Sequence, residues 1–303
     1  MTAAPHILTL TANLLAERTL EFESWTPGRT QRAQRESFQV GGKGINVSKM
    51  LARLGAPTTA LCFTGGAPGA ECEAWLRARP FPFQAFPTST PTRSGTVVRG
   101  AGHGETTFLG PDAPPDAAAI RACAEFLGAQ PSGSVLALCG SLPGWETPAY
   151  EPLRAAIHRW PERGPLIVDT YGPALAALAN EAASFVRINR TELHTLFGAG
   201  DRNVSSGELL RRAQDRFAVR RWAVSDGAAP VWFVDEHKAP ETIAGPRVRE
   251  VSPTGSGDVM LACVLFGRFH RGLSWREAVA WSLPYAAANA AHPGVAEFPW
   301  PEV

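Results

Sequence analysis

The apolar positions of the chain follow two different patterns. From about residue 114 onward, short apolar runs alternate with stretches that have the 3.6-residue period of a helix. This alternation is typical of a parallel sheet with helices on both faces, so we predict an α/β core. Helices are expected at residues 45–54, 116–129 and 147–160, and buried strands at residues 135–139, 165–170, 184–189 and 220–226.

The first third of the chain contains segments with the two-residue period of strands that are wet on one face. We predict that about residues 12–40 and 92–112 form a small separate sheet, a lid that covers a site. The alternative is that these strands form an antiparallel edge of the main sheet. The alternating segments are residues 19–25, 37–40, 95–99 and 105–109.

Length and composition narrow the class of protein. The 303 residues suit one large domain, so residues 1–303 are taken as a single unit. A net charge of +1 gives no electrostatic reason to expect nucleic acid or an anionic membrane as a partner. The first residues lack the basic leader of a signal peptide, and the longest apolar run, residues 259–266, is too short to span a bilayer. Five scattered cysteines without a C-x-x-C pair indicate reduced thiols, a cytoplasmic protein and no zinc site.

The stretch VSPTGSGDVMLACVLFG, residues 251–267, has the composition of a loop that leads into a buried helix. Ser252 and Thr254 are predicted helix caps, and Pro253 suits the start of a helix. The apolar residues 259–266 supply the helix itself. The sequence therefore predicts a buried helix whose N-terminus emerges from a glycine-rich loop.

Gly255, Ser256 and Gly257 stand directly before Asp258 at this predicted N-terminus. The first amides of a helix point outward and carry partial positive charge, and glycines admit a ligand to them, so the loop is interpreted as an anion cradle. The same dipole is expected to keep Asp258 ionised. A carboxylate beside an anion cradle suits phosphoryl transfer to an alcohol, in which the acid takes the hydroxyl proton. The alternative is that Asp258 only complements the helix dipole.

A second glycine-rich stretch, GGKGIN at residues 41–46, excludes two familiar nucleotide-binding motifs. Its lysine is followed by glycine, so it does not match G-x-x-x-x-G-K-[ST]. Val47 occupies the place of the third glycine in G-x-G-x-x-G. The sequence therefore supports neither a P-loop NTPase nor a Rossmann dinucleotide binder.

Several segments, taken together and in order, resemble the PfkB (ribokinase-like) family of carbohydrate kinases, and within it the 1-phosphofructokinase and tagatose-6-phosphate kinase branch. The resemblance implies a ribokinase-like α/β fold with a β-sheet lid that closes over the sugar and often pairs with the lid of a second subunit. It also implies ATP and Mg²⁺. The matching segments are QVGGKGINVSKMLARLG (39–55), CGSLPG (139–144), VDTYGPAL (168–175), INRTEL (188–193), AVSDG (223–227) and PTGSGDVMLA (253–262).

The resemblance assigns roles on the nucleotide side. Asp258 would be the catalytic base, and Gly255, Ser256 and Gly257 would form the anion hole. Asn189 and Glu192 would lie near the triphosphate, with Glu192 organising the metal through water. The alternative for Glu192 is that it only begins a helix, and the alternative for Asn289 is a helix-end role. The nucleotide would also be contacted by Ser225, Gly227 and, near the adenine, Asn289.

The resemblance also assigns roles on the acceptor side. Gly42 and Asn46 would hold sugar hydroxyls. Lys43, Arg93 and Ser141 are candidates for a phosphate already on the acceptor, because compact or forked cations suit phosphate. The alternative for Lys43 is a solvated loop lysine. Glu17 would replace a sugar-binding aspartate, and its alternative is a strand-edge residue that faces water.

The departures from the branch pattern lie mainly on the acceptor and lid side. The family's N-P-A-x-D corresponds here to residues 13–17 and ends in glutamate, T-R-x-N ends in Gly95, and K-P-N begins with Arg187. The lid loses both acids of T-E-L-N-E-P-G. We therefore expect an ATP-dependent kinase that phosphorylates a phosphorylated ketohexose, first of all fructose 1-phosphate to fructose 1,6-bisphosphate. The alternatives are tagatose 6-phosphate, a free sugar or a nucleoside as acceptor, or a non-catalytic sugar- or nucleotide-binding homologue.

Overall fold

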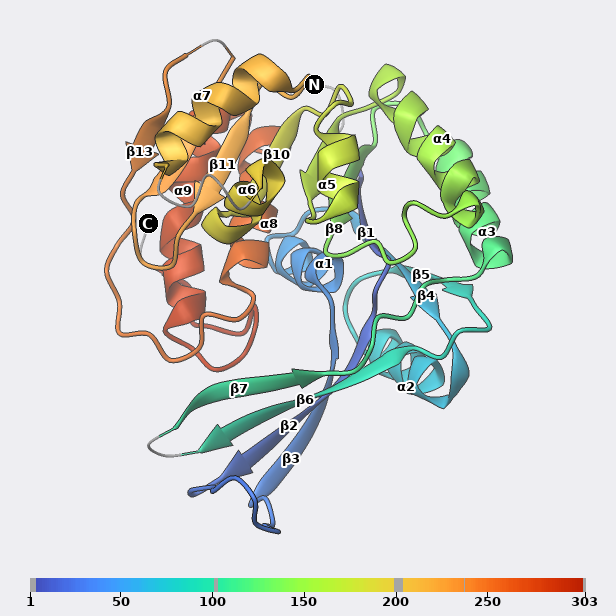
Figure 1. Cartoon of the computed structure of the whole chain (residues 1–303), viewed down its shortest axis with the longest axis vertical. Helices are drawn as coiled ribbons and strands as arrows, with labels where there is room; N and C mark the ends of the chain where they lie inside the picture. The colour runs from blue at the N-terminus through green and yellow to red at the C-terminus, as the bar shows by residue number, and fades with distance from the viewer. Residues whose placement is uncertain (1–3, 101–102, 199–203, 237, 302–303) are drawn as a thin grey trace.

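A large sheet forms the body of the chain in the computed structural model, which describes residues 4–100, 103–198, 204–236 and 238–301. Over these residues the sheet has nine strands in the order β13-β12-β11-β10-β9-β8-β1-β4-β5 (Figure 1). The β11–β12 and β12–β13 pairs are antiparallel, and the other pairs are parallel. The four strands predicted from apolar runs are confirmed as β8 to β11. The bounds are β1 Ile7–Thr11, β4 Thr58–Thr64, β5 Phe83–Pro87, β8 Val135–Cys139, β9 Leu166–Asp169, β10 Phe185–Asn189, β11 Trp222–Ser225, β12 Val231–Val234 and β13 Glu241–Ile243.

Helices cover both faces of this sheet because the strand side chains alternate between two apolar clusters. In β8, Leu136 and Leu138 pack in the cluster of α3 to α7, whereas Val135 and Ala137 pack with α1, α8 and α9. The three predicted helices are confirmed as α1, α3 and α4, the last with a short 3₁₀ turn at each end. The bounds are α1 Lys43–Arg53, α2 Gly66–Arg77, α3 Ala117–Gly128, α4 Glu151–Arg159, α5 Pro173–Leu178, α6 Arg190–Phe197, α7 Ser206–Arg216, α8 Ser256–Phe269 and α9 Trp275–Ala290.

Helix α8 is the predicted buried helix. Its residues 259–265 are all buried, which fits a helix that packs on the sheet and on neighbouring helices at once. It packs most extensively against α9 and also against α1. Among the described helices, none combines the length and the apolar character that crossing a membrane requires.

The first third of the chain builds a second sheet that projects from the body, as Figure 1 shows. Its strand order is β3-β2-β6-β7, with β2 and β6 parallel and the other two pairs antiparallel. We call this sheet the lid. The predicted separate lid is confirmed, and the alternative of an edge on the main sheet is wrong. Its strands are β2 Leu15–Phe22, β3 Arg35–Gly41, β6 Arg93–Gly100 and β7 His103–Leu109.

Candidate active site

A cavity of about 190 Å³ lies between the lid and the carboxyl ends of the parallel strands. Ligands of open α/β sheets bind at this edge. The cavity brings together acceptor-side residues and part of the α8 N-terminus, which the sequence places more than 100 residues apart. Its lining includes eight of the predicted site residues, namely Glu17, Gly42, Lys43, Asn46, Arg93, Ser141, Gly255 and Asp258.

The N-terminus of α8 is open toward the cavity. Gly255 is the N-cap residue, and no side chain caps the helix. The Ser256 amide donates to the Pro253 carbonyl, whereas the amides of Gly257 and Asp258 lie in the first turn, where a helix offers no carbonyl acceptor. These amides are free of a side-chain cap, so the interpretation of the turn as an anion cradle stays a prediction.

The predicted caps of α8 are wrong. The hydroxyls of Ser252 and Thr254 donate instead to the Glu105 carboxylate of the lid, at 3.1 and 2.7 Å. Because these hydroxyls point at the lid, they do not occupy the first amides of α8. No local pattern indicates that an acid 147 residues earlier competes for them.

The two glycines of this turn are required by neighbouring side chains of the protein itself. Gly255 has φ 76°, and a Cβ there would lie 2.4 Å from Val295. A Cβ at Gly257 would lie 2.1 Å from a guanidinium nitrogen of Arg187. Packing within the chain therefore restricts both positions, since Arg187 lies against Gly257 and Val295 against Gly255.

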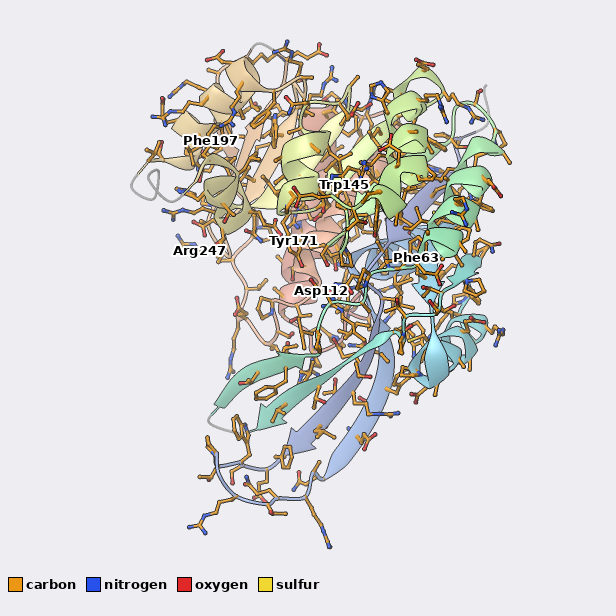
Figure 2. All side chains as sticks on the ribbon, turned by 45° about the vertical axis from the view of Figure 1, so that its right-hand side comes forward. Phe63, Asp112, Trp145, Tyr171, Phe197 and Arg247 are labelled. Atoms are coloured by element: carbon orange, nitrogen blue, oxygen red, sulfur yellow. The ribbon has the colours of Figure 1, made fainter. Side chains whose placement is uncertain are left out.

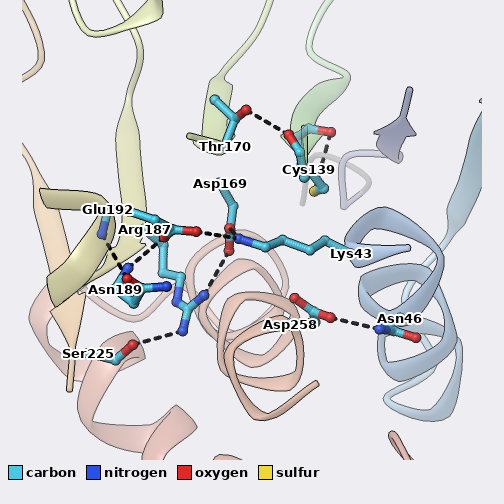
Figure 3. Close-up of polar contacts among 12 residues, drawn as sticks. Lys43, Asn46, Cys139, Asp169, Thr170, Arg187, Asn189, Glu192, Ser225 and Asp258 are labelled. Atoms are coloured by element: carbon cyan, nitrogen blue, oxygen red, sulfur yellow. Dashed lines mark hydrogen bonds and ion pairs between the residues drawn. The ribbon is translucent and has the colours of Figure 1, made fainter. Parts of the chain in front are cut away.

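Asp258 lies in the first turn of α8 with only 6% of its surface exposed. Its Oδ2 accepts a hydrogen bond of 2.7 Å from the Asn46 amide (Figure 3). Burial, and then the charge of Asp169, raise the pKa of Asp258 to about 6, while Lys43, Asn46 and Arg187 act in the opposite direction. Near pH 7 the carboxyl is therefore mostly ionised, as expected, although burial brings its pKa close to neutral.

Asp169 and Arg187 form a buried ion pair beside the cavity. Asp169 ends β9 and is fully buried, with the Lys43 ammonium at 2.6 Å from Oδ1 and the Arg187 guanidinium at 3.2 Å from Oδ2 (Figure 3). Arg187 also donates to Ser225 Oγ at 2.9 Å. An acid directly after a buried apolar strand was the signal for Asp169, because such a position lies at the ligand-binding edge of the sheet.

Lys43 lies at the start of α1 and is not a solvated loop lysine, so that alternative is wrong. Its ammonium bonds Asp169 at 2.6 Å and Glu192 at 3.2 Å. Burial tends to lower the pKa of Lys43, but the two carboxylates outweigh it and raise the pKa above its ordinary value. The ammonium is therefore held by two carboxylates on the side of the cavity assigned to the nucleotide.

Asn189 and Glu192 form a capping box at the start of α6. Asn189 Oδ1 accepts from the Glu192 amide, and Glu192 Oε2 accepts from the Asn189 amide, both at 2.8 Å. The structural alternative for Glu192 is thus present. Its second oxygen, Oε1, nevertheless reaches Lys43, so the same carboxylate also belongs to the buried charge cluster.

The remaining predicted nucleotide residues lie apart from the cavity. Ser225 ends β11 and bonds Arg187, and Gly227 follows in an exposed turn. Asn289 is fully buried, where its amide donates to the Thr254 carbonyl and to Ser256 Oγ and accepts from the Ala296 amide. Of the two roles considered for Asn289, these contacts fit the structural one, because its amide is engaged by the chain itself.

Glu17 points into the cavity from lid strand β2 and is only 7% exposed. The alternative of a strand-edge residue facing water is therefore wrong. Its carboxylate accepts a hydrogen bond from Gln39 of the adjacent strand. Burial raises the pKa of Glu17, opposed by the Gln39 hydrogen bond. A buried lid carboxylate with a neighbouring amide can bind sugar hydroxyls.

Arg93 and Ser141 lie close together at the acceptor end, joined through Asn13. The side-chain amide of Asn13 donates to Ser141 Oγ at 2.8 Å and to Asp112 at 2.7 Å. The backbone carbonyl oxygen of Asn13 accepts a hydrogen bond from Arg93. Arg93 also pairs with Asp112 at 3.4 Å. Asp112, labelled in Figure 2, lies where the lid joins the core and is exposed. The pairing of Asp112 with Arg93 could not be predicted, because nothing near residue 112 indicates its partner.

Comparisons with known proteins agree with this geometry over nearly the whole chain. The family described as pfkB family carbohydrate kinase matches residues 10–302. The ATP-dependent 6-phosphofructokinase isozyme 2 of Mycobacterium tuberculosis is 28% identical over 299 residues, which cover 96% of this chain and 86% of that protein. The 1-phosphofructokinase of Borreliella burgdorferi is 25% identical over 296 residues, covering 96% and 94%. The structure of phosphofructokinase-2 from Escherichia coli in complex with potassium has a TM-score of 0.85 at 26% identity and covers 96% of this chain and 94% of its own.

Proposed function

Because this chain belongs to the pfkB family of carbohydrate kinases and is an ATP-dependent sugar kinase, we propose that its acceptor is a phosphorylated ketohexose. The observation that supports this most is the arrangement of the cavity. The open turn of α8 and Asp258 line it together with Arg93 and Ser141. An acceptor with a hydroxyl at one end and a phosphate at the other matches both.

Each residue then has one task in the transfer. Asp258 takes the proton of the acceptor hydroxyl, for which a pKa of about 6 suits work near neutral pH. The amides of Gly257 and Asp258 receive the charge that develops on the transferred phosphoryl group. Asn46 holds the Asp258 carboxylate through its 2.7 Å hydrogen bond, and Glu17 binds the sugar from the lid side.

The charge cluster fits a magnesium–ATP complex in which the metal is held mainly by phosphate oxygens and water. Among the described residues there is no group of three or more His, Cys, Asp or Glu that could form a full ligand set. Glu192 is occupied by its capping box and by Lys43, so it suits a contact through water. When bound, Mg²⁺ would neutralise negative charge on the triphosphate. Lys43 would keep its ion pair with Asp169.

Fructose phosphates are the first acceptors to test. The relatives described above are named 6-phosphofructokinase and 1-phosphofructokinase. We place fructose 1-phosphate first, with fructose 1,6-bisphosphate as its product, and fructose 6-phosphate and tagatose 6-phosphate next. The carboxylate at Asp112 beside Arg93 favours an acceptor that also presents a hydroxyl there.

The deciding experiment is ADP release with a panel of acceptors, namely the three phosphorylated ketohexoses, free fructose and a nucleoside. We expect kcat/KM for the best phosphorylated ketohexose to exceed that for free fructose by at least about tenfold, the value of one charge-assisted contact. The Asp258→Asn variant is the blank. Turnover only with a free sugar or nucleoside would contradict the proposed acceptor. Absence of turnover with every member would favour a non-catalytic binding protein.

We also propose that two chains associate through their lids. Phe108 and Leu109 on β7 are 56% and 55% exposed, an unusual placement for two adjacent large apolar side chains. Light scattering after size-exclusion chromatography should give a dimer, and Phe108→Asp should shift it toward monomer. A monomeric wild-type chain at micromolar concentration would contradict the proposal.

A further inference from the structure

The lid is fastened to the loop before α8 by one carboxylate, Glu105. This side chain, on β7, is only 11% exposed. Its two oxygens accept hydrogen bonds from Thr254 Oγ1 at 2.7 Å and Ser252 Oγ at 3.1 Å. The Arg99 guanidinium of the adjacent lid strand neutralises the carboxylate at 2.8 Å and donates to the Pro293 carbonyl of the core. We call these five residues the clasp.

The clasp lies next to the turn that is to receive the phosphoryl group. Thr254 directly precedes Gly255, the N-cap residue of α8, and both line the cavity. Figure 1 shows β7 lying below the loops that lead into the C-terminal helices. A shift of the lid therefore acts on this turn through a single residue.

Helix α8 has no side-chain cap, and α1, α2, α4 and α5 also lack one. Helices α3, α7 and α9 begin with Asp116, Ser205 and Ser274, whose side chains accept from their own first amides. A side-chain cap on α8 would occupy the amides that an anion needs. The loop is instead fixed on its core side by Asn289, which bonds the Thr254 carbonyl, and on its lid side by Glu105.

We propose that Glu105 is a positioning residue for phosphoryl transfer, which couples the position of the lid over the acceptor to the position of the α8 anion turn. The proposal rests on the proposed kinase function. Within one chain, Glu105 links lid strand β7 to the loop before α8. Glu105 does not line the cavity and acts through Thr254 and Ser252.

The test compares Glu105→Gln with Glu36→Gln. Glu36 is also a lid acid, but it pairs with Arg18 of the neighbouring lid strand at 3.1 Å and lies at the exposed surface. Loss of hydrogen bonds to a charged group predicts that Glu105→Gln lowers kcat about tenfold, with the KM for ATP within about twofold. Glu36→Gln should leave both values unchanged. If Glu105→Gln lowers only the melting temperature, the clasp is merely structural and the proposal is overturned.

A double-mutant cycle tests the route of the coupling. Thr254→Val removes the hydroxyl and keeps the side-chain shape. If Glu105 acts through Thr254, the double variant should be no slower than the slower single variant. Multiplied losses in kcat would mean independent roles and would refute the coupling.

Hydrogen exchange gives a readout that needs no turnover. In Glu105→Gln, the amides of residues 254–258 should exchange several-fold faster, and in Glu36→Gln at the wild-type rate. Unchanged exchange in Glu105→Gln would overturn the proposal even if kcat falls. Faster exchange in a chain that shows no kinase activity would support the clasp while the proposed function fails.

Discussion

Replacing Asp258 by asparagine should abolish turnover and at the same time stabilise the fold. The carboxyl is 6% exposed, lines the cavity and is repelled by Asp169, so its negative charge is held at a cost in free energy. Asparagine has nearly the same shape and can still accept the 2.7 Å hydrogen bond from Asn46. The substitution therefore removes the charge and little else.

The magnitude follows from the pKa of Asp258, which rises from 3.8 to about 6 on folding. One pKa unit corresponds to about 1.4 kcal/mol, so the ionised carboxylate lowers the free energy of unfolding by about 3 kcal/mol. In the same variant, loss of the base should reduce kcat by roughly two to four orders of magnitude. Stability and activity are thus expected to change in opposite directions.

The difference in stability between Asp258→Asn and the wild type should depend on pH. Well below pH 4 the wild-type carboxyl is protonated in both the folded and the unfolded chain. The variant then has no stability advantage over the wild type. Between the ordinary pKa of 3.8 and about 6, the unfolded chain releases the proton first, and the stability of the wild type falls as pH rises. The advantage of Asp258→Asn should therefore grow over this window and be complete above it. Denaturant midpoints at a series of pH values measure it.

Asp169→Asn is the matched control, because it also removes a negative charge. The Asp169 side chain is fully buried, but it lies between the cations of Lys43 and Arg187. Loss of this charge leaves Lys43 and Arg187 without their shared partner and should destabilise the fold by about 3 to 5 kcal/mol. If Asp258→Asn is less stable than the wild type at pH 8, Asp258 is not a strained buried charge. Full activity of the variant would show that it is not the base.

Three further outcomes are expected. The pH profile of kcat should have an acidic limb near 6, where Asp258 loses its ability to accept a proton, and a profile flat down to pH 5 would contradict this. Arg93→Met should raise the KM for a phosphorylated sugar at least about tenfold more than for a free sugar, as steady-state kinetics would measure, and equal changes would refute a phosphate contact. Lys43→Met should lower kcat about tenfold or more while changing the acceptor KM less, because Lys43 is bound to Asp169 and Glu192; the opposite pattern would return it to the acceptor phosphate.

The fold was largely predictable because its signals are local. Buried apolar runs mark β8 to β11, and two-residue alternation marks the lid, whose exposed and covered faces differ. The helix of Asp258 was equally clear, since a glycine-rich turn precedes a continuous apolar stretch. Each of these features is contained within fewer than about twenty residues, which is the range over which periodicity is informative.

The site was predicted less completely because its contacts join distant segments. Lys43 and Asp169 are 126 residues apart, and Thr254 and Glu105 are 149 apart. A serine or threonine before a helix is usually its cap, but here a lid carboxylate competes successfully for both hydroxyls. Local propensity cannot reveal such a competitor, which explains the error at Ser252 and Thr254.

The close packing of Gly257 on Arg187 limits how this enzyme can be altered. A methyl group at residue 257 would collide with the guanidinium, so any larger residue there requires a shorter side chain at residue 187. That shorter side chain would in turn lose the link between Asp169 and Ser225. Transplanting the glycine-rich turn from another kinase, or evolving it in the laboratory, is therefore expected to succeed only when both positions are exchanged as a set.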